Sequence, residues 1–174
     1  VTLGTFLLWF GWFGFNGFSQ LAMGTFDDVN AISKIAVNTH LAGAAGTVTG
    51  AAITRLLGGK TDIVMMLNGA LAGLVAITAE PLTPGPITAM IIGSIGAVIM
   101  YFGTKMLEGF GIDDVVGAIP VHMFAGIFGT LVVPFTNADT SLGTQFVGTL
   151  SVVLFSFVLS YLVFMAMKVT IGLR

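Results

Sequence analysis

The chain has no cysteine and very few charged residues. Without cysteine it can form neither a disulfide nor a thiolate metal site, and its two histidines and scattered carboxylates lack the spacing of metal ligands. We therefore expect no metal, no cofactor and no redox role. Six lysines and arginines are dispersed along 174 residues with a net charge of −2, which gives no surface for nucleic acid.

Apolar residues make up 56% of the sequence, charged residues 8%, and the mean hydropathy is +1.03. A soluble domain of this size needs more polar surface, so the composition predicts an integral membrane protein. About 20 apolar residues cross the hydrocarbon layer as a helix, which leaves room for about six crossings and for no soluble domain. The first apolar run has no basic segment before it and is not typical of a signal peptide.

Apolar runs separated by turn residues predict one all-α domain over residues 1–174, a polytopic membrane bundle of six transmembrane helices. The expected spans are 2–24, 29–57, 62–79, 86–108, 114–134 and 143–172. The last span is longer than the bilayer is thick and should tilt or extend beyond it. Small residues at helix-packing spacing, Gly46–Gly50 and Gly69–Gly73, predict closely packed helices.

The basic residues predict the orientation of these spans. Assigning the short connections alternately to the two sides of the membrane places Lys34 alone on one side. The other side carries Arg55, Lys60, Lys105, Lys168 and Arg174. By the positive-inside rule this second side is cytoplasmic, so both ends of the chain are predicted to lie in the cytoplasm, in a plasma or inner membrane.

His122 lies near the middle of the apolar stretch 113–134, about 13 Å beyond Asp113 along a helix. A titratable group at this depth is costly, so it should face a protein interior or a water-accessible path. Desolvation favours its neutral imidazole, which can relay a proton. On an α-helical wheel its neighbours are the small residues Val115, Ala118, Ala125, Gly126 and Gly129. Either a lumen or a closely packed neighbouring helix would need that space, and the wheel does not distinguish them.

A second cluster lies in residues 11–19, GWFGFNGFS. On a helix Trp12, Phe15, Asn16 and Ser19 share one face, which combines aromatic rings with an amide and a hydroxyl. Such a face suits a weak cation site, through cation–π attraction and hydrogen bonding. An interfacial aromatic belt with an amide packed between helices would produce the same pattern.

Several stretches, in their order and spacing, resemble the ammonium transporter (Amt) family. They are GWFGFNGFS at 11–19, Asn38–Thr39, NGALAGLVAITA at 68–79, DDVVGAIPVH at 113–122 and TIGLR at 170–174. The resemblance covers the whole chain and implies helices six to eleven of an eleven-helix fold, in which two inverted five-helix repeats precede a long last helix. It also implies a homotrimer with one pore per subunit.

The resemblance implies roles for individual residues. Trp12 and Ser19 belong to an outer ammonium recruitment site, Phe15 to a pair of phenyl rings that gate the pore, and His122 to a pair of pore histidines. The first histidine, the other gating phenylalanine and an aspartate below the recruitment site come from the half of the family fold that this chain lacks. These residues alone therefore do not complete a pore.

The function implied is ammonium transport across the membrane. Ammonium is recruited, loses its proton and crosses an apolar pore as ammonia, because an ion pays a large desolvation cost there. The alternative is an ammonium-sensing membrane domain coupled to a cytoplasmic signalling domain. A PII-type signal protein at the cytoplasmic face is a candidate partner. No acid, serine or second histidine is placed beside His122 as a catalytic partner, so we do not expect an enzyme.

Three positions depart from the family pattern. Gly117 stands where many members carry an aspartate, and Phe18 is larger than the usual residue and should narrow the outer vestibule. His40 is outside the pattern, and we expect it either to hydrogen-bond between packed helices or to line a polar path, for which Asn16 is the other candidate.

Other charged residues have structural interpretations. Asp113 and Asp114 should cap the start of the fifth helix, where carboxylates accept hydrogen bonds from free amides. Lys105 and Glu108 are spaced for an i,i+3 ion pair.

Overall fold

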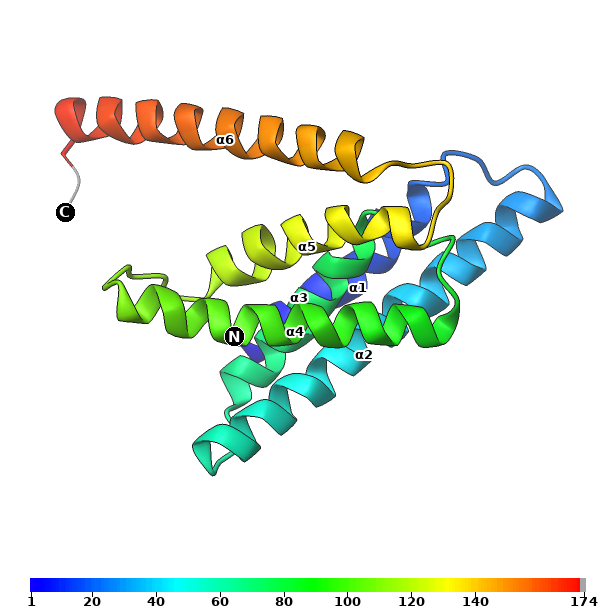
Figure 1. Cartoon of the computed structure of the whole chain (residues 1–174), viewed down its shortest axis with the longest axis horizontal. Coiled ribbons are helices and arrows are strands. Elements are labelled where there is room, and N and C mark those ends of the chain that lie inside the picture. Colours follow the sequence, from blue (N-terminus) through cyan, green and yellow to red (C-terminus); the bar gives the residue numbers. More distant parts are fainter. Residues whose placement is uncertain (173–174) are drawn as a thin grey trace.

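In the computed structural model, which describes residues 1–172, helices account for all of the regular structure and no strand occurs among those residues. The elements, labelled in Figure 1, are α1 (Thr2–Phe18), α2 (Phe26–Gly58), α3 (Ile63–Thr78), α4 (Pro86–Gly109), the π-helical turn η1 (Ile119–Phe124), α5 (Ala125–Val132), the 3₁₀ turn η2 (Val133–Phe135) and α6 (Leu142–Thr170). The all-α prediction is confirmed. Arg174, which contributed to the predicted orientation, lies outside the described residues.

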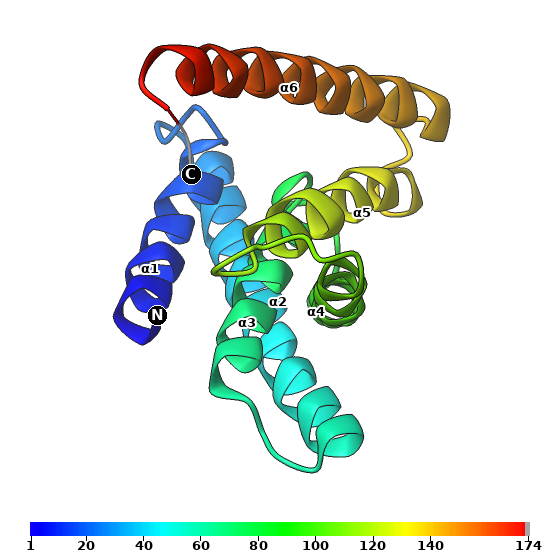
Figure 2. The same cartoon turned by 90° about the vertical axis from the view of Figure 1, so that its left-hand side faces the viewer.

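Helix α3 forms the centre of the bundle. It contacts α1, α2, α4, η1 and α5, and all but one of its residues from Leu67 to Ile77 are buried. Figure 2 shows α1 beside α2 and α3, with α4 on the other side of α3. The buried core of the described residues therefore consists of two clusters, both of which include residues of α3, and η1 and α5 pack against the same helix.

The packing of α2, α3 and α4 depends on glycine. A Cβ atom on Gly50 would lie 2.8 Å from the Met65 carbonyl oxygen, and one on Gly46 would lie even closer to the Gly69 carbonyl oxygen. On α4, a Cβ atom on Gly96 would lie 2.9 Å from the Ala72 carbonyl oxygen. The close helix packing predicted from Gly46–Gly50 and Gly69–Gly73 is confirmed, because only residues without side chains allow backbones to approach this closely.

Two of the predicted helical segments are shorter than expected. The first, 2–24, is helical only to Phe18, and Leu21 just beyond it has a φ of 60°, a left-handed conformation that an α-helix cannot contain. The fifth, 114–134, becomes helical only at Ile119, after Gly117 with a φ of 73°. Both boundaries are set by single backbone conformations that hydropathy does not report.

Capping residues fix other helix ends. Thr25 and Asp28 form a capping box at the start of α2, and the Asp62 side chain accepts hydrogen bonds from the amides of Val64 and Met65 at the start of α3. Gly59, with a φ of 73°, ends α2 in the left-handed conformation common at helix C-termini.

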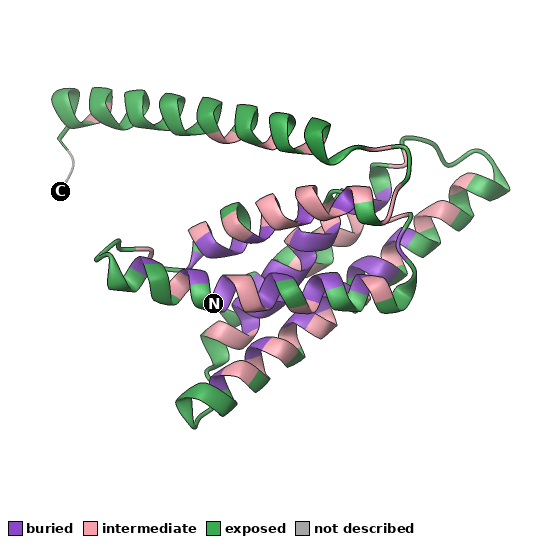
Figure 3. Cartoon of the chain, in the orientation of Figure 1, coloured by how far each residue is buried: buried purple, intermediate pink, exposed green. Residues whose placement is uncertain are grey.

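Among the described residues, two helices, α4 and α6, are by length and composition able to cross a membrane, while Ile63–Thr78 and Ile119–Phe135 are shorter apolar segments. Helix α6 lies apart from α2, α3 and α4 and contacts only α5 and η2 within the described chain. None of its residues from Leu142 to Thr170 is buried (Figure 3).

Candidate functional site

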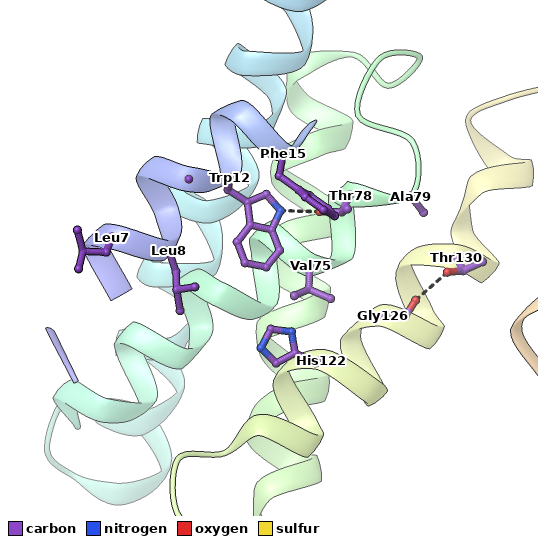
Figure 4. Close-up of a pocket in the computed structure, with 11 residues that line it drawn as sticks. Leu7, Leu8, Trp12, Phe15, Val75, Thr78, Ala79, His122, Gly126 and Thr130 are labelled. Atoms are coloured by element: carbon purple, nitrogen blue, oxygen red, sulfur yellow. Dashed lines mark hydrogen bonds between the residues drawn. The ribbon is translucent and has the colours of Figure 1, made fainter. Parts of the chain in front are cut away.

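A cavity of about 610 Å³ lies between α1, α3 and the segment formed by η1 and α5 (Figure 4). It is lined by Leu7, Leu8, Gly11, Trp12, Phe15, Val75, Thr78, Ala79, His122, Gly126 and Thr130. Its polar side chains are the indole of Trp12, the imidazole of His122 and the hydroxyls of Thr78 and Thr130. The rest of the lining is apolar, so the cavity offers few hydrogen-bond partners to a bound molecule.

The His122 imidazole and the Trp12 indole lie near each other in the cavity lining (Figure 4). Their ring centroids are 6.4 Å apart and their planes differ by 13°. Phe15 meets the indole edge-on, with centroids 6.2 Å apart and planes at 70°. The structure therefore brings together three of the residues predicted from sequence: Trp12, Phe15 and His122.

Thr78 fixes the indole. The Trp12 Nε1–H donates to the Thr78 Oγ1 at 2.7 Å, while the Thr78 hydroxyl donates to the Leu74 carbonyl at 2.6 Å. A hydroxyl has one hydrogen and two lone pairs, so Thr78 has used its donor and one acceptor position. The lone pair that remains can only accept, which suits an N–H or a cation as its partner.

Ser19 lies outside this cluster. It follows α1, is exposed, and its hydroxyl donates to the Phe15 carbonyl at 3.0 Å. It is not among the residues that line the cavity. Trp12 and Ser19, expected together at one recruitment site, are thus not brought together by the described residues, and the indole lies with His122 instead.

Asn16 and His40 also lie away from the cavity lining. Asn16 is 1% exposed and its amide donates to the Thr39 hydroxyl at 2.9 Å. His40 is exposed and its ring lies near those of Trp9 and Phe13, with centroids 5.6 Å and 6.1 Å away. Within residues 1–172 the His40 imidazole makes none of the interhelical hydrogen bonds that we considered for it.

The turn that carries His122 is anchored at its start. The Asp114 carboxylate accepts hydrogen bonds from the amides of Ala118 at 2.9 Å and Ile119 at 2.7 Å, which confirms the predicted cap for this residue. Asp113, its neighbour, accepts no such bond in the described structure. The predicted Lys105–Glu108 ion pair is confirmed at 2.9 Å.

Gly117 has a structural explanation. Its φ of 73° favours glycine, and a Cβ atom there would lie 2.7 Å from the Asn68 Nδ2, which donates to the Val116 carbonyl at 2.9 Å. An aspartate at this position would strain the backbone and collide with the Asn68 amide. The glycine and the asparagine together hold the segment that leads into η1.

Sequence reasoning assigned no role to Thr78, Thr130 or Asn38. Thr78 and Trp12 are 66 positions apart, so no helical period relates them. Asn38 is fully buried and its amide donates to the carbonyls of Pro81 and Pro84, both at 2.9 Å, which holds the connection between α3 and α4. The motifs at 38–39 and 68–79 contain Asn38 and Thr78 and were the available signals.

A bundle of apolar helices around a cavity with one imidazole, aromatic rings and few other polar groups is typical of one class, the helical membrane proteins. Within that class the chain belongs to the ammonium transporter family, whose model, described as Ammonium Transporter Family, matches residues 1–174.

Individual relatives agree with this assignment. The chain is similar to ammonium transporter Amt2 of Archaeoglobus fulgidus, with 48% identity over 129 residues, which cover 74% of this chain and 27% of the relative. It is also similar to a putative ammonium transporter of Synechocystis sp., with 39% identity over 170 residues, which cover 95% and 38% of the two chains.

Solved structures give the same fold. A sensor Amt protein matches with a TM-score of 0.90 and 34% identity, over 99% of this chain and 44% of that one. Mep2 of Candida albicans matches with a TM-score of 0.86 and 28% identity, over 97% and 40%. The chain spans less than half the length of each of these relatives.

Proposed function

We propose that the cavity beside Trp12 and His122 is one wall of a conduit for ammonium and ammonia. The observation that carries this proposal is the stacked Trp12–His122 pair, with Thr78, in an otherwise apolar lining. A bare ammonium ion would pay a large desolvation cost in such a cavity, whereas ammonia needs only one or two hydrogen-bond partners. The neutral imidazole and the threonine oxygen are of the right kind and number.

Ammonium is recruited near Ser19, passes Phe15 and loses its proton before the apolar part of the path. Phe15 lies on α1 and Ser19 directly follows the helix, in the order of this path, and Ser19 is roughly 10 Å beyond Trp12 at 1.5 Å per residue. In this scheme the Trp12 indole belongs to the inner wall, because it stacks on His122. His122 offers one nitrogen to ammonia and can relay a proton with the other.

We further propose that α1 to α6 correspond to helices six to eleven of the family fold, and that each of the six predicted spans crosses the bilayer. A 17-residue helix such as α1 is about 25 Å long. Helices of this length are tolerated in a thin or locally adapted bilayer. The complete protein is a homotrimer with both ends of this segment in the cytoplasm, where a PII-type signal protein is the candidate partner. The excess of basic residues near that face supports the orientation.

Uptake measurements test the conduit. His122→Ala in the complete protein, reconstituted in vesicles, should reduce the flux of ammonium or methylammonium by at least tenfold. His40→Ala is the matched control, since that imidazole lies outside the cavity lining, and its flux should match the unmodified protein. Unchanged flux and selectivity in His122→Ala would refute the role of the cavity.

The alternative function is ammonium sensing, in which the same cavity binds ammonium and a cytoplasmic domain reads the occupancy. The similarity to a sensor Amt protein, at a TM-score of 0.90, favours this candidate specifically. Ammonium binding to vesicle-reconstituted protein without flux, together with a signalling domain in the full reading frame, would support the sensor. Sustained flux that His122→Ala abolishes would support the transporter.

A further inference from the structure

The residue at the centre of the site, His122, does not lie on an ordinary α-helix. It lies in η1, a π-helical turn over Ile119–Phe124, and α5 begins only at Ala125. A π-helical turn is wider than an α-helical one, because its hydrogen bonds connect residues five apart, and it persists only where the surrounding packing supports it. The direction of the imidazole therefore depends on what holds this turn.

The support comes from α4, on the side of the turn that faces away from the cavity. Gly103 is buried, and a Cβ atom there would lie 2.8 Å from the Phe124 Cε2 and 3.2 Å from the Pro120 Cβ. Pro120 and Phe124 lie near the two ends of the turn, with His122 midway between them. The bare backbone of Gly103 is thus the surface against which both ends of η1 rest.

The contacts with α4 and the cavity lie on opposite sides of the turn. Phe124 follows His122 by two positions, about half a turn in a π-helix, so when the phenyl ring packs on α4 the imidazole points to the other side. Pro120 and Val121 are buried, and Val121 belongs to the core cluster that includes Leu71 and Met100. The turn is therefore confined on the α3 and α4 sides, and the imidazole extends toward Trp12.

We propose that Gly103 is a positioning residue for His122: by leaving room for Pro120 and Phe124, it lets η1 wind as a π-helical turn and sets the distance between the imidazole and the Trp12 indole. This inference rests on the proposed function of the cavity. A methyl group at Gly103 collides with the Phe124 ring, the closer of the two contacts, and also presses on the Pro120 Cβ, so the turn that carries both residues has to shift. The displacement reaches His122, two residues further along.

The test measures geometry independently of transport. The chain contains two tryptophans, Trp9 and Trp12. In a background where Trp9 and every tryptophan outside these 174 residues are replaced by phenylalanine, the emission of the complete protein reports on Trp12 and on the ring beside it. His122→Ala in that background defines the change caused by losing the imidazole. Gly103→Ala should change the emission in the same direction. Gly109→Ala is the control, because a Cβ atom on that glycine of the same helix has nothing within 4 Å, and it should leave the emission unchanged.

A second substitution identifies the contact. Phe124→Leu combined with Gly103→Ala removes the ring that the new methyl group meets, and it should restore the Trp12 emission at least in part. For flux, Gly103→Ala should lower the maximal rate several-fold at an unchanged half-saturating concentration, since recruitment occurs outside the cavity. If Gly103→Ala does not fold, Phe124→Leu alone tests the same contact by loosening the turn, and it should also change the emission.

If Gly103→Ala leaves the Trp12 emission unchanged, the positioning role is overturned, whatever happens to flux. Where Gly103→Ala does not fold, an unchanged emission in Phe124→Leu overturns it. A changed emission that the double variant does not restore would also overturn it. Failure of the proposed conduit looks different: the emission changes as expected while neither Gly103→Ala nor His122→Ala affects flux.

Discussion

The imidazole of His122 and the indole of Trp12 lie nearly parallel, with their planes 13° apart and their centroids separated by 6.4 Å. One ring comes from the first helix of the chain and the other from a turn more than a hundred residues later, so the cavity wall is built by tertiary packing. The indole is fixed in turn by Thr78 on α3. Three elements thus meet at one pair of rings.

Thr78→Val should release the indole. Valine has nearly the same shape as threonine but cannot accept the Trp12 Nε1–H, so the folded state should lose about 1 kcal/mol and flux should fall several-fold. Thr130→Val is the matched control, because its hydroxyl lines the same cavity but bonds only to the Gly126 carbonyl of its own helix. Thermal unfolding and vesicle flux measure the two effects. Equal results for the two valine variants would contradict the role given to Thr78.

Asp114→Ala should weaken the start of the turn that carries His122. It removes the acceptor for the amides of Ala118 and Ile119, and the loss of a helix cap costs about 1 kcal/mol. Asp113→Ala removes the same charge at the adjacent position without removing those hydrogen bonds. The midpoint of thermal unfolding should fall for the first variant and stay nearly unchanged for the second. A larger effect at Asp113 would show that charge and not capping matters here.

Gly50→Ala should separate α2 from α3. Its methyl group would lie 2.8 Å from the Met65 carbonyl oxygen, and overpacking of this kind costs about 1 to 3 kcal/mol. Gly58→Ala, on the same helix but with nothing within 4 Å of the added atom, should be neutral or slightly stabilising because alanine favours helix. Chemical unfolding in detergent compares the two. Similar stability of both variants would rule out the glycine contact as a determinant of the packing.

Acid should weaken the start of α2 through Asp28. Hydrogen bonds from the Thr25 hydroxyl and the Gln20 amide hold the pKa of this carboxyl below its ordinary value of 3.8. A lowered pKa in the folded state means that the ionised form stabilises the fold above the unfolded-state pKa, and that this contribution is lost as the pH falls through the folded-state pKa.

The stability difference between the unmodified protein and Asp28→Asn should therefore be constant above about pH 5 and shrink below about pH 4. Unfolding measured over this range tests the expectation. Asp27→Asn, which changes the neighbouring carboxylate, should retain the acid-dependent loss seen in the unmodified protein. A difference for Asp28→Asn that grows as the pH falls would have the wrong sign for this mechanism.

Hydropathy and glycine spacing predicted the helical class and the close packing of α2 with α3, because both depend on composition along single segments. The ends of those segments were less predictable. The left-handed conformation of Leu21 ends the first helical segment early, and no apolar pattern signals a single positive φ.

The residues of the site were more predictable from the sequence than their arrangement in space. Trp12, Phe15 and His122 were identified from the sequence and line one cavity. Their partners were not, since Thr78 is 66 positions from Trp12 and the wheel around His122 assumed an α-helix where the chain forms a π-helical turn. Ser19 was grouped with Trp12 by helical spacing, but α1 ends at Phe18, one residue before it.

The glycine contacts of α2, α3 and α4 also determine which parts of the cavity wall can move. Where backbones touch without intervening side chains, no rotamer change can absorb a displacement, so these three helices behave as one rigid block. Thr78 belongs to that block, whereas Trp12 and His122 are carried by α1 and η1, which pack on its surface. The distance between the two rings is therefore set by how α1 and η1 pack on this rigid block, and a change in that distance would move the rings and leave the threonine in place.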